Sequence, residues 1–129
     1  MSREIRFRAW DKENKTMYDW QTIRQYPIDY TFGSDIVTPM QYTGLYDPNG
    51  QPIYEGDVVS CTNGHIGIVK FGRYKDSDMS NHYKCGHLGF YIDLNDDFLR
   101  KDICYWHGTG MKVIGNVYEN PELLQEVEK

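Results

Sequence analysis

The chain has 129 residues, of which 40% are hydrophobic and 26% are charged, and its formal net charge is −5. This length suits one domain that buries its own core without disulfides or metal, and the composition argues against an intrinsically disordered chain. The balance of 14 basic against 19 acidic residues lowers the expectation of a protein that grips nucleic acid through its phosphates.

The sequence also lacks the signals of a membrane or secreted protein. No run approaches the roughly 20 consecutive apolar residues of a membrane-spanning helix, and no apolar segment follows the basic residues near Met1. The three cysteines are odd in number and irregularly spaced, which is typical of thiols in a reducing compartment. We expect a cytoplasmic protein that does not contact a membrane.

Aromatic residues give the first indication of fold. The 11 Tyr, 5 Phe and 3 Trp, together with 12 Gly, favour β-structure, where aromatic and β-branched side chains fit a half-buried pleated surface. Polar residues alternate with apolar ones over Glu4–Trp10, which predicts a strand, and Thr16–Trp20 is its predicted hairpin partner. Arg6 and Arg8 share the outer face of the first strand; they can hold a polyanion, but we favour a solvated face that protects a sheet edge.

The connector from 21 to 39 is harder to interpret. Apolar residues fall at a spacing of two from Tyr26 to Phe32, which predicts a short strand that ends at Gly33. A second short strand is expected at Ile36–Thr38, ended by Pro39, because proline cannot donate to a sheet ladder.

Turn signals organise the middle of the chain. Asp47–Gly50 reads Asp-Pro-Asn-Gly, which combines an Asp that bonds its own backbone, a Pro with fixed φ and a Gly free to take positive φ. Asn63 and Gly64 then form the strongest short-range hairpin signal, directly after the β-branched run Val58–Cys61. This stretch predicts chain reversals and no particular chemistry.

The second half of the chain predicts a compact antiparallel module. Its strand candidates are Val58–Cys61, His65–Phe71, Gly89–Leu94 and Met111–Tyr118, separated by polar loops at 72–88 and 95–110. Glycine-rich strands of this kind are typical of a small Src-homology-3-like barrel. The predicted fold class is therefore mainly β, or α+β if a short C-terminal helix is counted, with an N-terminal β-hairpin region and a small antiparallel barrel.

The tail carries helix signals. Asn120 can cap, Pro121 suits the first helical position, and the apolar residues that follow fall on one side of a helix over 121–128. A helix of about two turns does not persist alone in water, so it must pack on this chain's own sheet or on a neighbouring copy.

Several blocks of the sequence resemble the YopX family of phage and prophage proteins. They are Arg3–Asp11, Met40–Leu45, Asp47–Gly50, Ile53–Val58 and Val113–Leu124. The resemblance implies one YopX-like domain over 1–129, which we divide into an N-terminal β subdomain (1–44), a barrel-like subdomain (45–120) and the tail helix (121–128). It implies a phage or prophage context in a bacterial cell, and it brings no catalytic residue and no cofactor.

A zinc site is the sharpest chemical candidate. His82, Cys85 and His87 follow the spacing His-x2-Cys-x-His, and Cys104 with His107 forms a Cys-x2-His pair. Zinc takes four nitrogen or sulfur ligands in a tetrahedron, and these five residues are the candidates. The sequence lacks a Cys-x2-Cys knuckle, and surface histidines with packed thiols account for the same residues. We predict no metal site. Cys61 with His65 is weaker still, because the Asn63-Gly64 turn explains both positions.

Catalytic sets are equally sparse. No signature of a nucleophilic cysteine surrounds Cys61, Cys85 or Cys104. The acidic groups lack the spacing of a calcium loop and are expected to be solvated loop acids; they are Asp76, Asp78, Asp93, Asp96 and Asp97. We expect a protein that is not an enzyme, with no cofactor, no catalytic residue and no metal ligand.

The aromatic surplus is the better functional indication. The Tyr and Trp residues exceed what a small core can hold, and these types concentrate at interfaces; they are Tyr42, Tyr46, Tyr54, Tyr74, Tyr83, Tyr91, Tyr105, Trp106 and Tyr118. We predict a binding module that self-associates through the tail helix and exposed aromatics, and that has a host or phage protein as a possible partner.

Two alternatives stay open. One is a nucleic-acid accessory protein of phage replication or gene control, with the basic set Arg3, Arg6, Arg8, Lys70, Arg73 and Lys75 near aromatic residues. The other is a small metal- or thiol-dependent enzyme.

Overall fold

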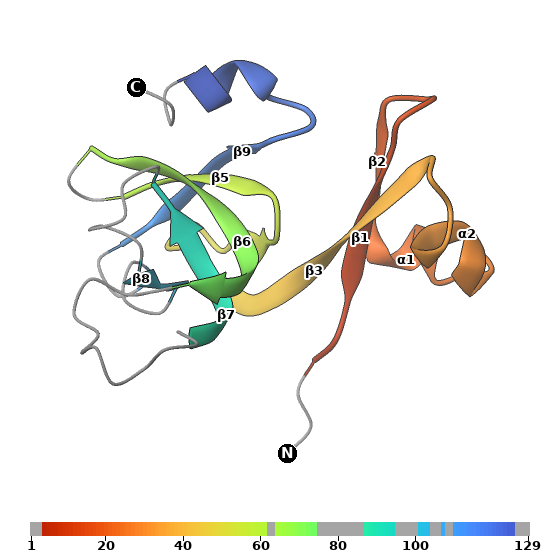
Figure 1. The fold of residues 1–129 in the computed structure, drawn as a ribbon, viewed down its shortest axis with the longest axis horizontal. Helices are drawn as coiled ribbons and strands as arrows, with labels where there is room; N and C mark the ends of the chain where they lie inside the picture. Colours follow the sequence, from red (N-terminus) through yellow and green to blue (C-terminus); the bar gives the residue numbers. More distant parts are fainter. Residues whose placement is uncertain are drawn as a thin grey trace.

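The protein is mostly β (Figure 1). A computed structural model describes residues 4–61, 64–74, 87–94, 101–103, 107 and 110–125. In chain order the elements are β1 (Phe7–Asp11), β2 (Thr16–Tyr18), α1 (Trp20–Ile23), α2 (Ile28–Phe32), β3 (Val37–Tyr46), β4 (Pro52–Tyr54), β5 (Asp57–Ser60), β6 (Ile66–Tyr74), β7 (His87–Asp93), β8 (Lys101–Asp102), β9 (Lys112–Asn116) and the 3-10 helix η2 (Pro121–Leu123). The prediction of a mainly β chain is confirmed.

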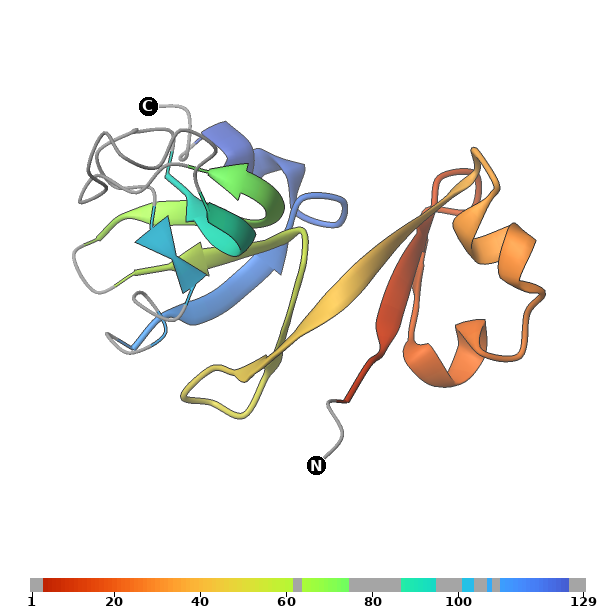
Figure 2. The same cartoon turned by 60° about the horizontal axis from the view of Figure 1, so that its bottom comes forward.

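The strands form two antiparallel sheets, in the orders β2-β1-β3-β4 and β8-β7-β6-β5-β9. Figures 1 and 2 show two lobes, with β3 running from one to the other. We call the part with β1, β2, α1 and α2 the N-terminal lobe and the five-stranded sheet with η2 the C-terminal lobe. The subdomain boundary predicted at 44–45 falls inside β3.

The strand β1 is the centre of the N-terminal sheet, because it pairs with β2 on one side and β3 on the other. Ala9 and Val37 lie on one face and are buried with Ile23 of α1. The other face carries Arg6 and Arg8, whose side chains are only 22% and 12% exposed. The interpretation of these arginines as a solvated sheet edge is therefore wrong, since β1 is an interior strand.

The first hairpin is confirmed with shifted ends. Its turn is organised by Asp11, whose side chain is buried although it is a carboxylate. Oδ1 of Asp11 accepts the backbone N–H groups of Glu13 and Asn14, at 2.9 and 3.0 Å. Oδ2 accepts the Tyr18 hydroxyl at 2.6 Å and the Asn14 side-chain amide at 2.9 Å. One carboxylate thus replaces the water that four donors would otherwise need.

The strand predicted from Tyr26 to Phe32 is wrong, because this segment contains α2. Alternation indicates a strand only when it buries one side, but Tyr26, Ile28 and Phe32 are 40%, 77% and 46% exposed. Thr31 is the residue of α2 that is buried. The preceding helix α1 has a local signal that the interpretation missed: Asp19 caps it by accepting the Thr22 N–H at 2.9 Å. In the described ranges, none of the helices is long and apolar enough to cross a membrane.

The prediction that Pro39 ends a strand is also wrong, since β3 continues through it to Tyr46. The Tyr42 N–H donates to the Arg6 carbonyl, and the Lys12 N–H donates to the Ile36 carbonyl. The backbone N–H and C=O groups of the even-numbered residues of β3 therefore point toward β1. Pro39 is odd-numbered and directs its missing N–H away from β1. The ladder therefore loses no hydrogen bond.

The C-terminal lobe matches the predicted strands closely. β5, β6, β7 and β9 cover the four candidates, and β8 is added at the edge. In the described ranges the two outer strands β8 and β9 are not paired with each other, so the curled sheet is a half-barrel. Its core is apolar and consists of Ile53, Val59, Cys61, Val69, Ile92, Leu94, Ile103 and Met111.

The turn at Asp47–Gly50 is confirmed in detail. Gly50 has a φ of +81° and donates its N–H to the Asp47 carbonyl at 2.9 Å. Oδ1 of Asp47 accepts the N–H groups of Asn49 and Gln51, both at 2.9 Å. Oδ2 accepts the N–H of Val113 from β9 at 3.0 Å, so this local turn also attaches to the half-barrel.

The predicted tail helix begins at Pro121 as the 3-10 turn η2 and continues as α-helix at Leu124 and Gln125; residues 126–129 lie outside the described ranges. Asn120 does not cap η2 with its side chain; its Oδ1 instead accepts the Asn116 N–H at 3.2 Å. A Cβ added to Gly115 would lie 2.9 Å from Leu123 Cδ1. The start of the tail therefore packs against this chain's own β9.

The Asp11 cluster predicts an acid-sensitive hairpin. The hydrogen bond from Tyr18, with those from Asn14 and Glu13, lowers the pKa of Asp11 below its ordinary value. A lowered folded-state pKa contributes stability above the unfolded pKa of about 3.9 and loses it as the pH falls further. We expect Asp11→Asn to lower the melting temperature at neutral pH and to flatten the fall in melting temperature below pH 4, relative to wild type. Equal acid sensitivity of the variant and the wild type would contradict this role.

Candidate functional site

A buried ion pair joins the two lobes. Nη2 of Arg8 in β1 lies 2.6 Å from Oδ1 of Asp57 at the start of β5. Oδ2 of Asp57 accepts the Tyr54 N–H at 2.8 Å, so both carboxylate oxygens are satisfied. Burial raises the pKa of Asp57 above its ordinary value, and the positive charge of Arg8 opposes this rise. A charge pair with almost no exposure is costly to break, because either partner alone would be left in a dry environment.

Aromatic rings cover both arginines. The guanidinium of Arg6 lies 4.3 Å from the ring centroid of Tyr42, and that of Arg8 lies 4.8 Å from the centroid of Tyr54. Burial, together with a hydrogen bond to Tyr46, raises the pKa of Tyr42 to about 12. These are cation–π contacts between partly desolvated groups; Tyr42 is buried and Tyr54 is half-buried.

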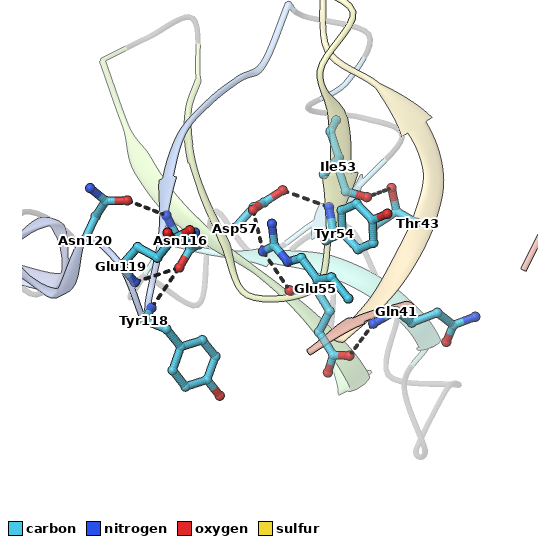
Figure 3. A network of polar contacts seen from close by, with 11 residues as sticks. Gln41, Thr43, Ile53, Tyr54, Glu55, Asp57, Asn116, Tyr118, Glu119 and Asn120 are labelled. Atoms are coloured by element: carbon cyan, nitrogen blue, oxygen red, sulfur yellow. Dashed lines mark hydrogen bonds and ion pairs between the residues drawn. The ribbon is translucent and has the colours of Figure 1, made fainter. Parts of the chain in front are cut away.

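The segment from Tyr54 to Asp57 is the physical junction between the lobes. Glu55 donates its N–H to Gln41 of β3 at 2.9 Å, and its Oε1 accepts the Gln41 N–H at 3.3 Å. Gly56 bonds to the other lobe, donating to the carbonyl of Val69 at 2.9 Å. Figure 3 shows Asp57 facing the backbone of Tyr54, with Glu55 reaching toward Gln41. The sequence interpretation treated Asp57 as the start of a strand and missed its pairing; an acid directly before a buried β-branched run was the available signal.

Beside this junction lies a groove of about 400 Å³, which we call the inter-lobe groove. Apolar side chains from both lobes line it, including Met40 of β3, Phe71 of β6 and Val117 after β9. Glu55 and Lys70 contribute charged groups to its lining. A concave, mostly apolar surface with few polar groups is the usual form of a binding site.

A second set of exposed apolar side chains lies in and just before α2, and we call it the helical patch. It consists of Tyr26, Ile28, Tyr30 and Phe32, which are 37% to 77% exposed. Its rings are held edge to face, with centroid distances of 5.3 Å for Tyr26–Tyr30 and 5.0 Å for Phe32 with Phe7 of β1. Three of the four patch residues therefore have ring contacts within the lobe. Sequence periodicity had assigned these residues to a strand and so missed them as a surface.

The candidate zinc ligands are largely outside the described ranges: His82, Cys85, Cys104 and the side chain of His87. Nε2 of His107 lies 2.7 Å from the Tyr46 carbonyl. Among the described residues no group of three or more His, Cys, Asp or Glu side chains has the form of a metal site.

Among the thiol and acid candidates, Cys61 and Asp93 lie in the described ranges, and both have contacts within the fold. Burial raises the pKa of Cys61 to about 11, which is the opposite of what a nucleophilic thiol requires. Asp93 forms an ion pair with Lys70 at 2.6 Å. The other acids considered, Asp76, Asp78, Asp96 and Asp97, lie outside the described ranges.

The members of the nucleic-acid alternative's basic set that lie in the described ranges are not assembled into one surface. Arg6 and Arg8 face the aromatic rings and Asp57 at the centre of the molecule, and Lys70 pairs with Asp93. Arg73 is exposed on β6. Arg3 and Lys75 lie outside the described ranges. Three of these six side chains thus already have partners within the fold.

The comparisons with known proteins agree with the fold. The family model described as YopX protein matches residues 21–125. The structure is similar to the crystal structure of protein EF1440 from Enterococcus faecalis, with 21% sequence identity and a TM-score of 0.60 over 95% of this chain and 99% of that chain. At this identity the likeness supports the fold alone. The comparison with curated proteins gives no match.

We predict that Arg8→Ala lowers the free energy of unfolding by about 3 kcal/mol, because it leaves the Asp57 carboxylate buried and unpaired. A double variant that carries Arg8→Ala and Asp57→Asn should regain part of the lost free energy of unfolding. The amide oxygen of the new side chain can still accept the Tyr54 N–H, and it leaves no buried charge. Urea unfolding of the wild type and both variants measures the effect.

The matched control is Arg73→Ala, which removes an exposed arginine from β6 and should change the free energy of unfolding by less than about 0.5 kcal/mol. Equal losses for Arg8→Ala and Arg73→Ala, or a double variant that is less stable than Arg8→Ala, would contradict the importance of this ion pair.

Proposed function

Because the chain belongs to the YopX protein family, we propose that it is a phage- or prophage-encoded binding module that self-associates. In this proposal it acts in the cytoplasm of the bacterial host, without catalysis and without a cofactor. The observation that carries the proposal is the helical patch, since four large apolar side chains exposed within seven residues of one another mark a candidate interaction surface.

The surroundings of four buried groups support the proposal of a protein without catalysis. Asp11 and Asp47 each organise a turn, and Asp57 pairs with Arg8. Cys61 is buried with a raised pKa. A catalytic group needs access to a substrate and a partner that activates it, and these four groups are instead committed to the fold.

A second copy of this chain is the occupant that we propose for the helical patch. Between residues 25 and 34 the sequence carries one charged residue, Asp29, whereas the whole chain has a net charge of −5. Two copies of an acidic protein repel each other over most of their surface, so a nearly uncharged apolar patch is where they can meet at the lowest electrostatic cost. A two-fold dimer would place the same patch on both sides of the interface.

We place self-association at the helical patch and not at the tail. Leu123 packs next to Gly115 of β9, and the Asn120 side chain bonds to Asn116, so the described part of the tail is used within one chain. The inter-lobe groove remains available for apolar side chains of a host or phage protein, which is the other partner in this proposal.

We predict that Ile28→Asp weakens self-association by more than about tenfold, because each copy then buries a carboxylate in an apolar contact. Ile28 is 77% exposed, so the substitution should leave the fold intact. Sedimentation equilibrium over a range of micromolar concentrations measures the association constant, and circular dichroism checks the fold.

The control is Leu88→Asp, which adds the same charge at a 69% exposed residue of β7 in the other lobe and should leave the association constant unchanged. A wild type that stays monomeric at all these concentrations would refute self-association. A wild-type dimer that Ile28→Asp does not weaken would refute the helical patch as its interface.

A further inference from the structure

A second concave site, which shares Tyr118 with the inter-lobe groove, lies where the first hairpin meets the turn after β9. It has a volume of about 560 Å³ and is lined by Trp10, Lys12, Lys15, Tyr118, Glu119 and Pro121. Small-molecule sites commonly measure roughly 300–1,000 Å³, so this one has room for a ligand of nucleotide size. We call it the junction site.

Buried polar residues hold both walls of the junction site in place. Asp11 fixes the hairpin that carries Lys12 and Lys15 through the hydrogen bonds described above. Asn116 fixes the opposite turn: its Oδ1 accepts the N–H groups of Tyr118 and Glu119, at 3.0 and 2.8 Å. Figure 3 shows these bonds around Asn116. Both walls are therefore preorganised before any ligand arrives, which lowers the entropic cost of binding.

The walls combine aromatic rings with unpaired positive charges. The rings of Trp10 and Tyr118 stack directly on each other, with a centroid distance of 5.7 Å and an interplanar angle of 19°, and together form one aromatic wall of the site. In the part of the chain that the structure describes, neither Lys12 nor Lys15 takes part in an ion pair. Glu119 is the acid at the rim, and its Oε1 accepts the Asn116 side-chain amide at 2.8 Å.

We propose that the junction site binds a phosphorylated nucleoside, either free or at the end of a single-stranded nucleic acid. The ammonium groups of Lys12 and Lys15 complement phosphate oxygens. The apolar surface of Trp10, Tyr118 and Pro121 suits a planar base, and aromatic side chains stack on bases of any sequence. The Glu119 carboxylate supplies an acceptor for a ribose hydroxyl or a base amino group. This inference goes beyond self-association and does not depend on it.

Lys15 offers a variant that separates binding from folding. Its backbone is left-handed, with a φ of 52°, a conformation that costs a lysine about 1–2 kcal/mol and an asparagine less. Lys15→Asn should therefore relieve strain and raise the melting temperature while it removes a charge from the junction site. A merely structural role for Lys15 cannot produce changes of opposite sign in stability and binding.

The test titrates the full chain with ATP and, separately, with a single-stranded oligothymidylate, using isothermal calorimetry at low salt. We expect saturable binding by the wild type and a loss of affinity of about tenfold or more in the double variant Lys12→Ala with Lys15→Asn, because two charge-assisted hydrogen bonds are removed. Lys112→Ala is the matched control, since it removes an exposed lysine of β9 outside the site and should leave the affinity unchanged.

The two ligands distinguish the sources of the nucleoside. Tighter binding of the oligonucleotide than of ATP indicates a single-stranded nucleic acid, and tighter binding of ATP indicates a free nucleotide; both outcomes support the junction site. No saturable binding of either ligand to the wild type would overturn the proposal. Equal affinities of the wild type and the double variant would also overturn it, because the lysines would then not contact the ligand.

Discussion

The ion pair between Arg8 and Asp57 is the constraint on which the arrangement of the lobes depends. It ties the central strand of one sheet to the first strand of the other, and the rings of Tyr42 and Tyr54 cover the arginines beside it. A buried pair of this kind adds little net stability compared with apolar packing, but it penalises every arrangement that separates the partners. The groove beside it therefore has a defined shape, because its two walls cannot slide freely past each other.

Local signals were sufficient for the parts of the fold that depend on neighbouring residues. The Asp47–Gly50 turn and the strands of the half-barrel follow from side chains within a few positions, and they are confirmed. The pairing of Arg8 with Asp57 spans 49 residues, and no pattern in one sequence indicates which acid an arginine will meet. Tyr42 and Tyr54 were expected at an interface because tyrosine is common at interfaces. The residue type does not indicate which face of the fold a tyrosine occupies, and the structure places both rings over arginines.

The error at 26–32 has a different cause. A spacing of two describes both a half-buried strand and a helix that leaves several apolar side chains in solvent, and the sequence does not say which faces are covered. At Pro39 the sequence predicted the end of a strand, but the strand continues. Whether proline ends a strand depends on which side of the strand its nitrogen faces. The helical patch was missed because local pattern and tertiary packing disagree there. The junction site was missed because its two walls, the first hairpin and the turn after β9, lie about 100 residues apart in the sequence.

The last strand of the half-barrel has a consequence for synthesis of the protein. β5 pairs with β9, and the ribosome adds β9 only after β6, β7 and β8. Until then one side of β5, the strand that carries the buried residues Val58 and Val59, has no partner in the nascent chain. Unpaired strand edges recruit other chains, so the interval before β9 emerges is when aggregation competes with folding. Chains truncated before β9 would keep this exposed edge permanently.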